Sequence, residues 1–198
     1  MKASRRELLL GTAALGAAAI AGNACNEKPK LPEDDPRYQG LLFLVPIEAR
    51  TVDAWIEQLL PADHPPGTPG ARAANVLLYI DKQLAQKHFT TIARGVRRAA
   101  VILQRAAVAQ GAAHFADLDA PAQRVLLERL QQNQLAAFAE KTNTAKTFDT
   151  VLLLALEGYL GDPSYGGNKD QIVWRALGDS PACPKPLDAN AHRHGHHE

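Results

Sequence analysis

Residues 148–160 read Phe-Asp-Thr-Val-Leu-Leu-Leu-Ala-Leu-Glu-Gly-Tyr-Leu and form the most apolar segment in the body of the chain. Steps of three and one residues place most of its apolar side chains on one face of an α-helix; these are Phe148, Val151, Leu152, Ala155, Leu156 and Tyr159. Leu153, Leu154 and Leu160 lie on the two sides of this face and widen the apolar surface of the helix. A helix that is apolar over so much of its circumference belongs at the centre of a bundle, where neighbours cover several of its faces. We therefore expect a central helix that breaks between Gly158 and Gly161.

Helical spacing of apolar residues recurs on both sides of this segment. Further helices are expected at residues 52–60, 71–86, 90–110, from Asp119 onward, and 169–177. The sequence has no repeat of fixed period, which favours a compact bundle over a helical solenoid. Alternating β-branched stretches are hard to find, so an all-β fold is not expected. The predicted fold class is all-α, a compact bundle of five or six helices.

Local signals predict where several of these helices begin or end. Pro61 ends the first, and the loop at residues 61–70 contains four Pro and two Gly, which no helix tolerates. Thr90 or Thr91 can cap the third helix. Asp119 is a good N-cap because a Pro follows in the first turn. The helix that it opens should direct three side chains toward the core, those of Leu127, Leu130 and Phe138.

The amino-acid composition excludes some classes of function. The chain has 198 residues, 46% of them hydrophobic, which is enough for one domain with a real core. It has 22 Lys and Arg against 21 Asp and Glu, so it lacks the basic field that nucleic-acid binding needs. The two cysteines, Cys25 and Cys183, cannot form a multi-disulfide scaffold, and neither lies in a CxxC motif. Nucleic acid is therefore not an expected partner.

The N-terminus resembles an export signal. Arg5 and Arg6 precede 15 uncharged residues from Leu8 to Gly22, whereas a helix needs about 20 residues to cross a bilayer. The adjacent arginines resemble the twin-arginine signal, whose translocon moves folded proteins. The alternative, a cytosolic amphipathic start, would need a polar face that this run lacks. Residues 1–24 are therefore expected to be a twin-arginine export signal.

A linker is expected after the signal, at residues 25–47. Its first residue, Cys25, is either lipidated as the new N-terminus or left at the end of a discarded peptide. Residues 26–36 are polar and rich in Pro, as a tether leading away from a membrane anchor would be. A periplasmic location follows, with membrane anchoring if Cys25 is lipidated.

Familiar catalytic motifs are missing from the sequence. It contains no HExxH, no Gly-x-Ser-x-Gly, no Walker A loop and no paired Glu-x-x-His of di-iron bundles. Asp63 and His64, in the Pro-rich loop, fit a carboxylate-held base or half of a metal site, but hydrogen bonding within the loop is the favoured interpretation. We expect no catalytic, cofactor-binding or metal-binding residue in this chain.

The last residues, 186–198, are expected to form a disordered tail. It carries four imidazoles within His192–His197, a composition that holds Zn²⁺, Cu²⁺ or Ni²⁺ weakly. This leaves open an alternative function, that of a lipidated envelope protein that binds metal through the tail and through His64.

Residues 162–170, Asp-Pro-Ser-Tyr-Gly-Gly-Asn-Lys-Asp, are the densest feature of the sequence, and Trp174 and Gly178 follow them. Pro fixes one bend, the paired Gly allows positive φ, and Asp or Asn can cap the next helix. The sequence predicts a structured turn here. Its aromatic and polar groups suit protein recognition, and a role in closing the bundle is the alternative.

Two stretches resemble the gluconate 2-dehydrogenase subunit 3 family, the small subunit of flavin-dependent sugar and polyol dehydrogenases. One runs from Leu60-Pro61-Ala62-Asp63 through Pro69-Gly70-Ala71 to Val76 and Tyr79-Ile80-Asp81; the other is the turn at 162–170 with Trp174 and Gly178. The resemblance covers about residues 48–185. The longer, Pro-rich first loop and the His tail depart from the family pattern.

The resemblance implies a helical subunit without a cofactor, which binds an FAD-carrying large subunit of the glucose-methanol-choline oxidoreductase type, often with a cytochrome c. It carries over no catalytic residue. Combined with the signal, it predicts an export escort that stabilises its flavoprotein partner. The candidate partner-binding residues are Asp63, Asp162, Tyr165, Gly166, Gly167, Asn168 and Trp174.

Overall fold

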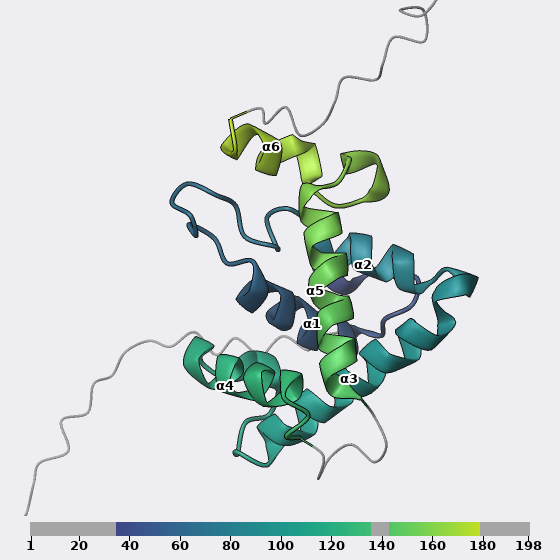
Figure 1. Ribbon diagram of the computed structural model, residues 1–198, viewed down its shortest axis with the longest axis vertical. Coiled ribbons are helices and arrows are strands. Elements are labelled where there is room, and N and C mark those ends of the chain that lie inside the picture. Colours follow the sequence, from purple (N-terminus) through teal and green to yellow (C-terminus); the bar gives the residue numbers. More distant parts are fainter. Residues whose placement is uncertain (1–34, 136–142, 179–198) are drawn as a thin grey trace, which may run out of the picture. The chain divides into compact units, whose positions relative to one another are not determined.

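The computed structural model describes residues 35–135 and 143–178. These residues form six α-helices and contain no strand, which confirms the all-α prediction. The helices are α1 Pro46–Leu59, α2 Val76–Leu84, α3 Thr90–Val108, α4 Ala120–Gln131, α5 Thr144–Leu160 and α6 Ile172–Ala176. All six belong to one compact unit, and Figure 1 shows α5 passing among the other helices.

The central helix is α5, which contacts α1, α2, α3 and α4. Its buried face is formed by Thr144, Phe148, Val151, Leu154, Ala155 and Gly158. On this face Phe148 lies against the fully buried Trp55 of α1, with ring centroids 5.8 Å apart. The predicted position of this helix is therefore confirmed.

The expectation that neighbours cover α5 on several sides was wrong for three leucines. Leu153, Leu156 and Leu160 are 58%, 38% and 48% exposed. The helices that pack on α5 cover the face that carries Phe148 and Val151, and they leave this other apolar face open. A pattern within one helix records which residues are apolar, but the neighbouring helices decide which of them are covered.

The predicted break of α5 between Gly158 and Gly161 is confirmed, because the helix ends at Leu160 and Gly161 is its C-cap. Gly158 lies inside the helix beneath the side chain of Tyr79, and a Cβ at this position would come within 2.8 Å of the Tyr79 ring. Close packing of α2 on α5, and not a turn, explains this glycine.

Several helix starts differ from the prediction, and α1 begins at Pro46, six residues before the expected position 52. The second helix begins at Val76 and not at residue 71, because Asn75 has a left-handed backbone (φ 58°) that separates the preceding turns from α2. Phe89, and not Thr90 or Thr91, is the N-cap of α3, and Thr90 is its first helical residue. The Thr90 hydroxyl donates to the Lys87 carbonyl at 2.6 Å.

The Asp119 prediction is confirmed, since its carboxylate accepts the Ala122 N–H at 2.9 Å at the start of α4. Leu127 and Leu130 of α4 are buried as expected. Phe138 lies outside the described residues.

Part of the expected linker packs on the helices. The buried carboxylate of Asp81 accepts the backbone N–H groups of Leu42, Phe43 and Leu44 at 2.5, 3.0 and 2.8 Å. The hydroxyl of Tyr38, itself buried, donates to Asp53 at 3.0 Å. The folded domain therefore begins by residue 38, about ten residues before the expected boundary, because two buried carboxylates need donors that this segment supplies.

No helix in the described ranges has the length and apolar character to cross a membrane.

Candidate docking surface at the end of α5

An open apolar stripe runs along the C-terminal half of α5. Leu153, Leu156 and Leu160 follow one another in steps of three and four residues, so they share one side of the helix. Single exposed leucines are ordinary on protein surfaces, whereas a row of them on one helix is a candidate contact surface. We call these three residues the leucine stripe.

The turn predicted at residues 162–170 lies directly beyond the end of α5 and leads into α6 (Figure 1). At its start the Asp162 carboxylate accepts the Ser164 N–H at 2.8 Å. Hydrogen bonds from the side chain and backbone of Ser164 lower the pKa of Asp162. Tyr165 is 63% exposed, so Asp162 and Tyr165 form the outer side of the turn.

The inner side of the turn packs against the end of α5. A Cβ at Gly167 would overlap the Gly158 carbonyl oxygen. Asn168 is fully buried; it donates to the Gly161 carbonyl at 3.1 Å and accepts the Val173 N–H at 3.0 Å. Gly167 and Asn168 therefore hold α6 against α5.

Three further hydrogen bonds attach this region to its neighbours. The Asn75 side chain donates to the Gly166 carbonyl at 3.2 Å, and the Lys169 N–H donates to the Ala74 carbonyl at 3.1 Å. The Trp174 indole N–H donates to the Leu160 carbonyl at 2.8 Å. Trp174 therefore lies at the C-terminal end of the leucine stripe, and the turn fixes the edge of that surface.

Asp63 belongs to a different local structure. Its backbone N–H donates to the Thr68 carbonyl at 2.8 Å, and its carboxylate accepts the Gly67 N–H at 3.2 Å. The favoured interpretation, hydrogen bonding within the loop, agrees with these contacts. The next part of the loop is attached to α5 by the Tyr159 hydroxyl, which donates to the Pro69 carbonyl at 2.6 Å.

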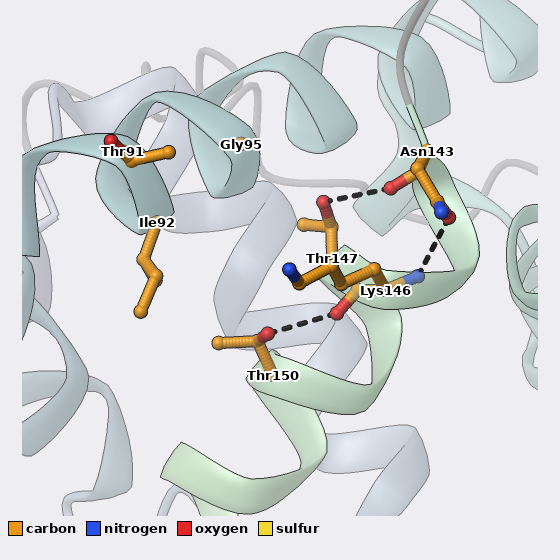
Figure 2. A pocket seen from close by; sticks show the side chains of 7 residues that line it. All are labelled: Thr91, Ile92, Gly95, Asn143, Lys146, Thr147 and Thr150. Atoms are coloured by element: carbon orange, nitrogen blue, oxygen red, sulfur yellow. Dashed lines mark hydrogen bonds between the residues drawn. The ribbon is translucent and has the colours of Figure 1, made fainter.

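A hollow of about 190 Å³ lies between the N-terminal ends of α3 and α5. Figure 2 shows its lining residues, which are Thr91, Ile92 and Gly95 from α3, the N-cap Asn143 of α5, and Lys146, Thr147 and Thr150 from α5 itself. The hydroxyls of Thr147 and Thr150 donate to backbone carbonyls one turn earlier, at 3.2 and 2.8 Å. Most polar groups of this hollow are thus used by α5 itself.

A second hollow, of about 240 Å³, lies beside the packed linker segment. The Asp53 carboxylate in its wall pairs with Arg37 at 3.3 Å and with Arg72 at 2.8 Å. Burial, together with the nearby Asp53 charge, raises the pKa of the Tyr38 hydroxyl. This arrangement holds the segment before α1 in place.

Sequence reasoning missed Asp53, the buried hydrogen-bonding role of Asp81, and the leucine stripe. Asp53 and Asp81 each lie within an apolar run that faces the core, which is a signal for a buried carboxylate with designated donors. The stripe had a weaker signal. Its three leucines are spaced three and four residues apart, and they lie beside the face that carries Phe148 and Val151.

The remaining predicted sites fall outside the described residues; they are Arg5, Arg6, Cys25 and the His tail. Among the residues that are described, no group of three or more His, Cys, Asp or Glu side chains is arranged to hold a metal ion.

Comparison with curated proteins and with solved structures gave no match. Comparison with family models gave a match to gluconate 2-dehydrogenase subunit 3 over residues 46–180. This range includes all six helices, the Pro-rich loop and the C-terminal turn, and it is well over half of the chain. The chain belongs to the gluconate 2-dehydrogenase subunit 3 family.

Proposed function

We propose that the chain is the non-catalytic small subunit of an FAD-dependent sugar or polyol dehydrogenase, and that the leucine stripe binds the flavin-carrying subunit. The partner is a large subunit of the glucose-methanol-choline oxidoreductase type, and a cytochrome c completes the complex. Family membership supports a place in a dehydrogenase complex. The observation that carries the docking part is the open apolar stripe on α5.

The stripe has the features of the centre of an interface. Three leucines supply apolar area, and Trp174 and the exposed Tyr165 lie in the segment beyond its C-terminal end. Aromatic residues of this kind carry much of the energy of protein interfaces. Because Gly167 and Asn168 fix the turn, the surface is formed before the partner arrives, which lowers the entropy cost of binding.

Leu156→Asp tests this surface. The side chain is partly exposed, so the variant should keep its fold, whereas an aspartate buried against the partner would lose its water. We expect recovery of the flavoprotein with the affinity-tagged chain to fall at least tenfold, which corresponds to about 1.4 kcal/mol. The flavin absorbance of the purified fraction gives the measurement.

Val125→Asp is the matched control, because Val125 is 52% exposed and lies on α4, a different helix from the one that carries the stripe. This variant should retain the flavoprotein. Retention by Leu156→Asp, with unchanged circular dichroism, would show that the stripe is not the contact; equal loss in both variants would have the same meaning.

The escort role joins this docking to the expected signal at residues 1–24. A flavoprotein folds around FAD in the cytoplasm, and a large subunit without its own signal crosses only when it is bound to a chain that has one. Replacing Arg5 and Arg6 by Lys should leave both proteins in the cytoplasm. A dehydrogenase that still reached the periplasm would refute the escort role while leaving the docking surface untouched.

A further inference from the structure

The outer face of α3 carries an unusual concentration of unpaired positive charge. From Thr90 to Val108 the helix has four arginines and no acidic residue. Arg97 is accounted for by its ion pair with Glu48 at 2.9 Å. Arg94, Arg98 and Arg105 are exposed, and in the described ranges none of them has an ion-pair partner.

These three arginines form a regular row with two valines. The order Arg94, Arg98, Val101, Arg105, Val108 advances in steps of four and three residues, which keeps all five on one side of α3. Val101 and Val108 are 39% and 55% exposed. The opposite side of α3 is buried in the core through residues such as Val96 and Leu103. We call the five residues the arginine stripe; it is about 21 Å long.

We propose that the arginine stripe lays α3 on an anionic phospholipid surface. A guanidinium group binds a phosphate through two parallel hydrogen bonds. A row of such groups on one side of a helix therefore matches a plane of phospholipid headgroups. The interleaved valines can enter the headgroup region to a shallow depth, as the apolar residues of interfacial helices do. Because the rest of α3 is held by the core, the helix reaches the surface already folded.

The composition of the stripe favours a lipid surface over an acidic protein partner. The energy of protein interfaces concentrates in a few buried Trp, Tyr and Arg anchors, and the arginine stripe offers exposed arginines without any aromatic residue among them. The leucine stripe, in contrast, has the aromatic side chain of Trp174 at its end. The two stripes are on different helices, and the membrane proposal does not depend on the proposed function.

The expected strength of the contact is set by the number of charges. A basic residue near an anionic membrane strengthens binding about fivefold, so three should contribute roughly a hundredfold. The contribution should vanish in 1 M salt, where the screening length is about 3 Å.

The test is vesicle flotation with the full chain and with Arg94→Gln/Arg98→Gln/Arg105→Gln. Vesicles of phosphatidylcholine alone are compared with vesicles that contain 30% phosphatidylglycerol. The readout is the gain in binding caused by the anionic lipid, because the N-terminal segment contributes equally in every variant. The matched control, Arg124→Gln/Arg129→Gln/Arg175→Gln, removes the same charge from exposed positions on α4 and α6.

We expect the gain in binding caused by the anionic lipid to fall roughly a hundredfold in the stripe variant. In the control it should fall less than about fivefold. Equal losses in the two variants would show that binding depends on net charge and not on the position of the arginines, which would overturn the proposal. Full binding by the stripe variant would also overturn it. If that variant instead lost the flavoprotein on co-purification, the stripe would be assigned to a protein contact. Circular dichroism should be unchanged in all variants, since every substituted side chain is exposed.

Discussion

At the scale of single residues, Asn168 is the most constrained member of the C-terminal turn. Its fully buried side chain joins the end of α5 to the start of α6 through the Gly161 carbonyl and the Val173 N–H. Its backbone is left-handed (φ 40°), a conformation that Asn adopts more readily than most residues. Both its side chain and its backbone therefore favour Asn at this position.

Asn168→Ala should lower the free energy of unfolding by about 2–3 kcal/mol, because it leaves a buried donor and a buried acceptor without partners. Urea denaturation of the purified chain measures this change. Tyr165→Ala, three residues earlier and exposed, should change it by less than about 0.5 kcal/mol. Similar values for the two variants would contradict the role assigned to Asn168.

Tyr38 should make the stability of the fold depend on pH in the alkaline range. Burial and the Asp53 carboxylate raise the pKa of its hydroxyl, so the folded protein keeps it protonated at a pH where the unfolded chain ionises. An unfolded tyrosine has a pKa of about 10. The stability contributed by Tyr38 is therefore complete below about pH 10 and is lost as the pH rises further.

Comparison with Tyr38→Phe isolates this effect from other titrating groups. Tyr79 has its own pKa raised to about 12 by burial and by its hydrogen bond to Glu157, and it contributes equally to both proteins. The parent should be more stable than Tyr38→Phe at pH 8, and this advantage should shrink between pH 10 and 11 in urea unfolding. A constant difference from pH 8 to 11 would mean that Tyr38 ionises normally.

At the scale of helices, two glycines in helix interiors provide a matched pair. In Gly158→Ala the new Cβ would come within 2.8–2.9 Å of Tyr79 atoms, whereas at Gly95 the nearest atom is the Thr147 hydroxyl oxygen at 3.2 Å. Replacing Gly by Ala inside a helix otherwise gains about 1 kcal/mol.

Gly158→Ala should cost about 2 kcal/mol, because it pushes α2 away from α5. Gly95→Ala should stay within about 1 kcal/mol of the parent, since the helix gain offsets a small shift of Thr147. Thermal unfolding followed by circular dichroism measures both. A Gly158→Ala protein as stable as the parent would show that the packing of α2 on α5 is loose.

Helix positions could be predicted from the sequence because apolar spacing and caps such as Asp119 are local properties. The errors arose where distant residues intervene. The linker seemed separate because its donors pair with Asp81 and Asp53, and the packing role of Gly158 was missed because Tyr79 is remote in sequence. Part of the site could likewise be predicted: the turn at 162–170 was identified, but its division into a buried and an exposed side requires the contacts with α5.

At the scale of the whole molecule, near-neutral composition conceals an uneven surface. Lys and Arg balance Asp and Glu over the chain, yet α3 presents a row of arginines and α5 presents a row of leucines. Family membership indicates a subunit of a dehydrogenase complex, and an adaptor needs contact surfaces of this kind. We therefore expect these two surfaces to carry the function of the chain, while the core and the C-terminal turn hold them in shape.

Photocrosslinking tests the central claim, that the leucine stripe holds a flavin-carrying subunit, most directly. A benzophenone amino acid is placed at Leu156 or, as the control, at Val125, and the full chain is irradiated in its native cells. Mass spectrometry then identifies the crosslinked chain. We predict an adduct with an FAD-binding oxidoreductase from position 156 and none from position 125. No adduct from position 156, or the same adduct from both positions, would contradict the claim.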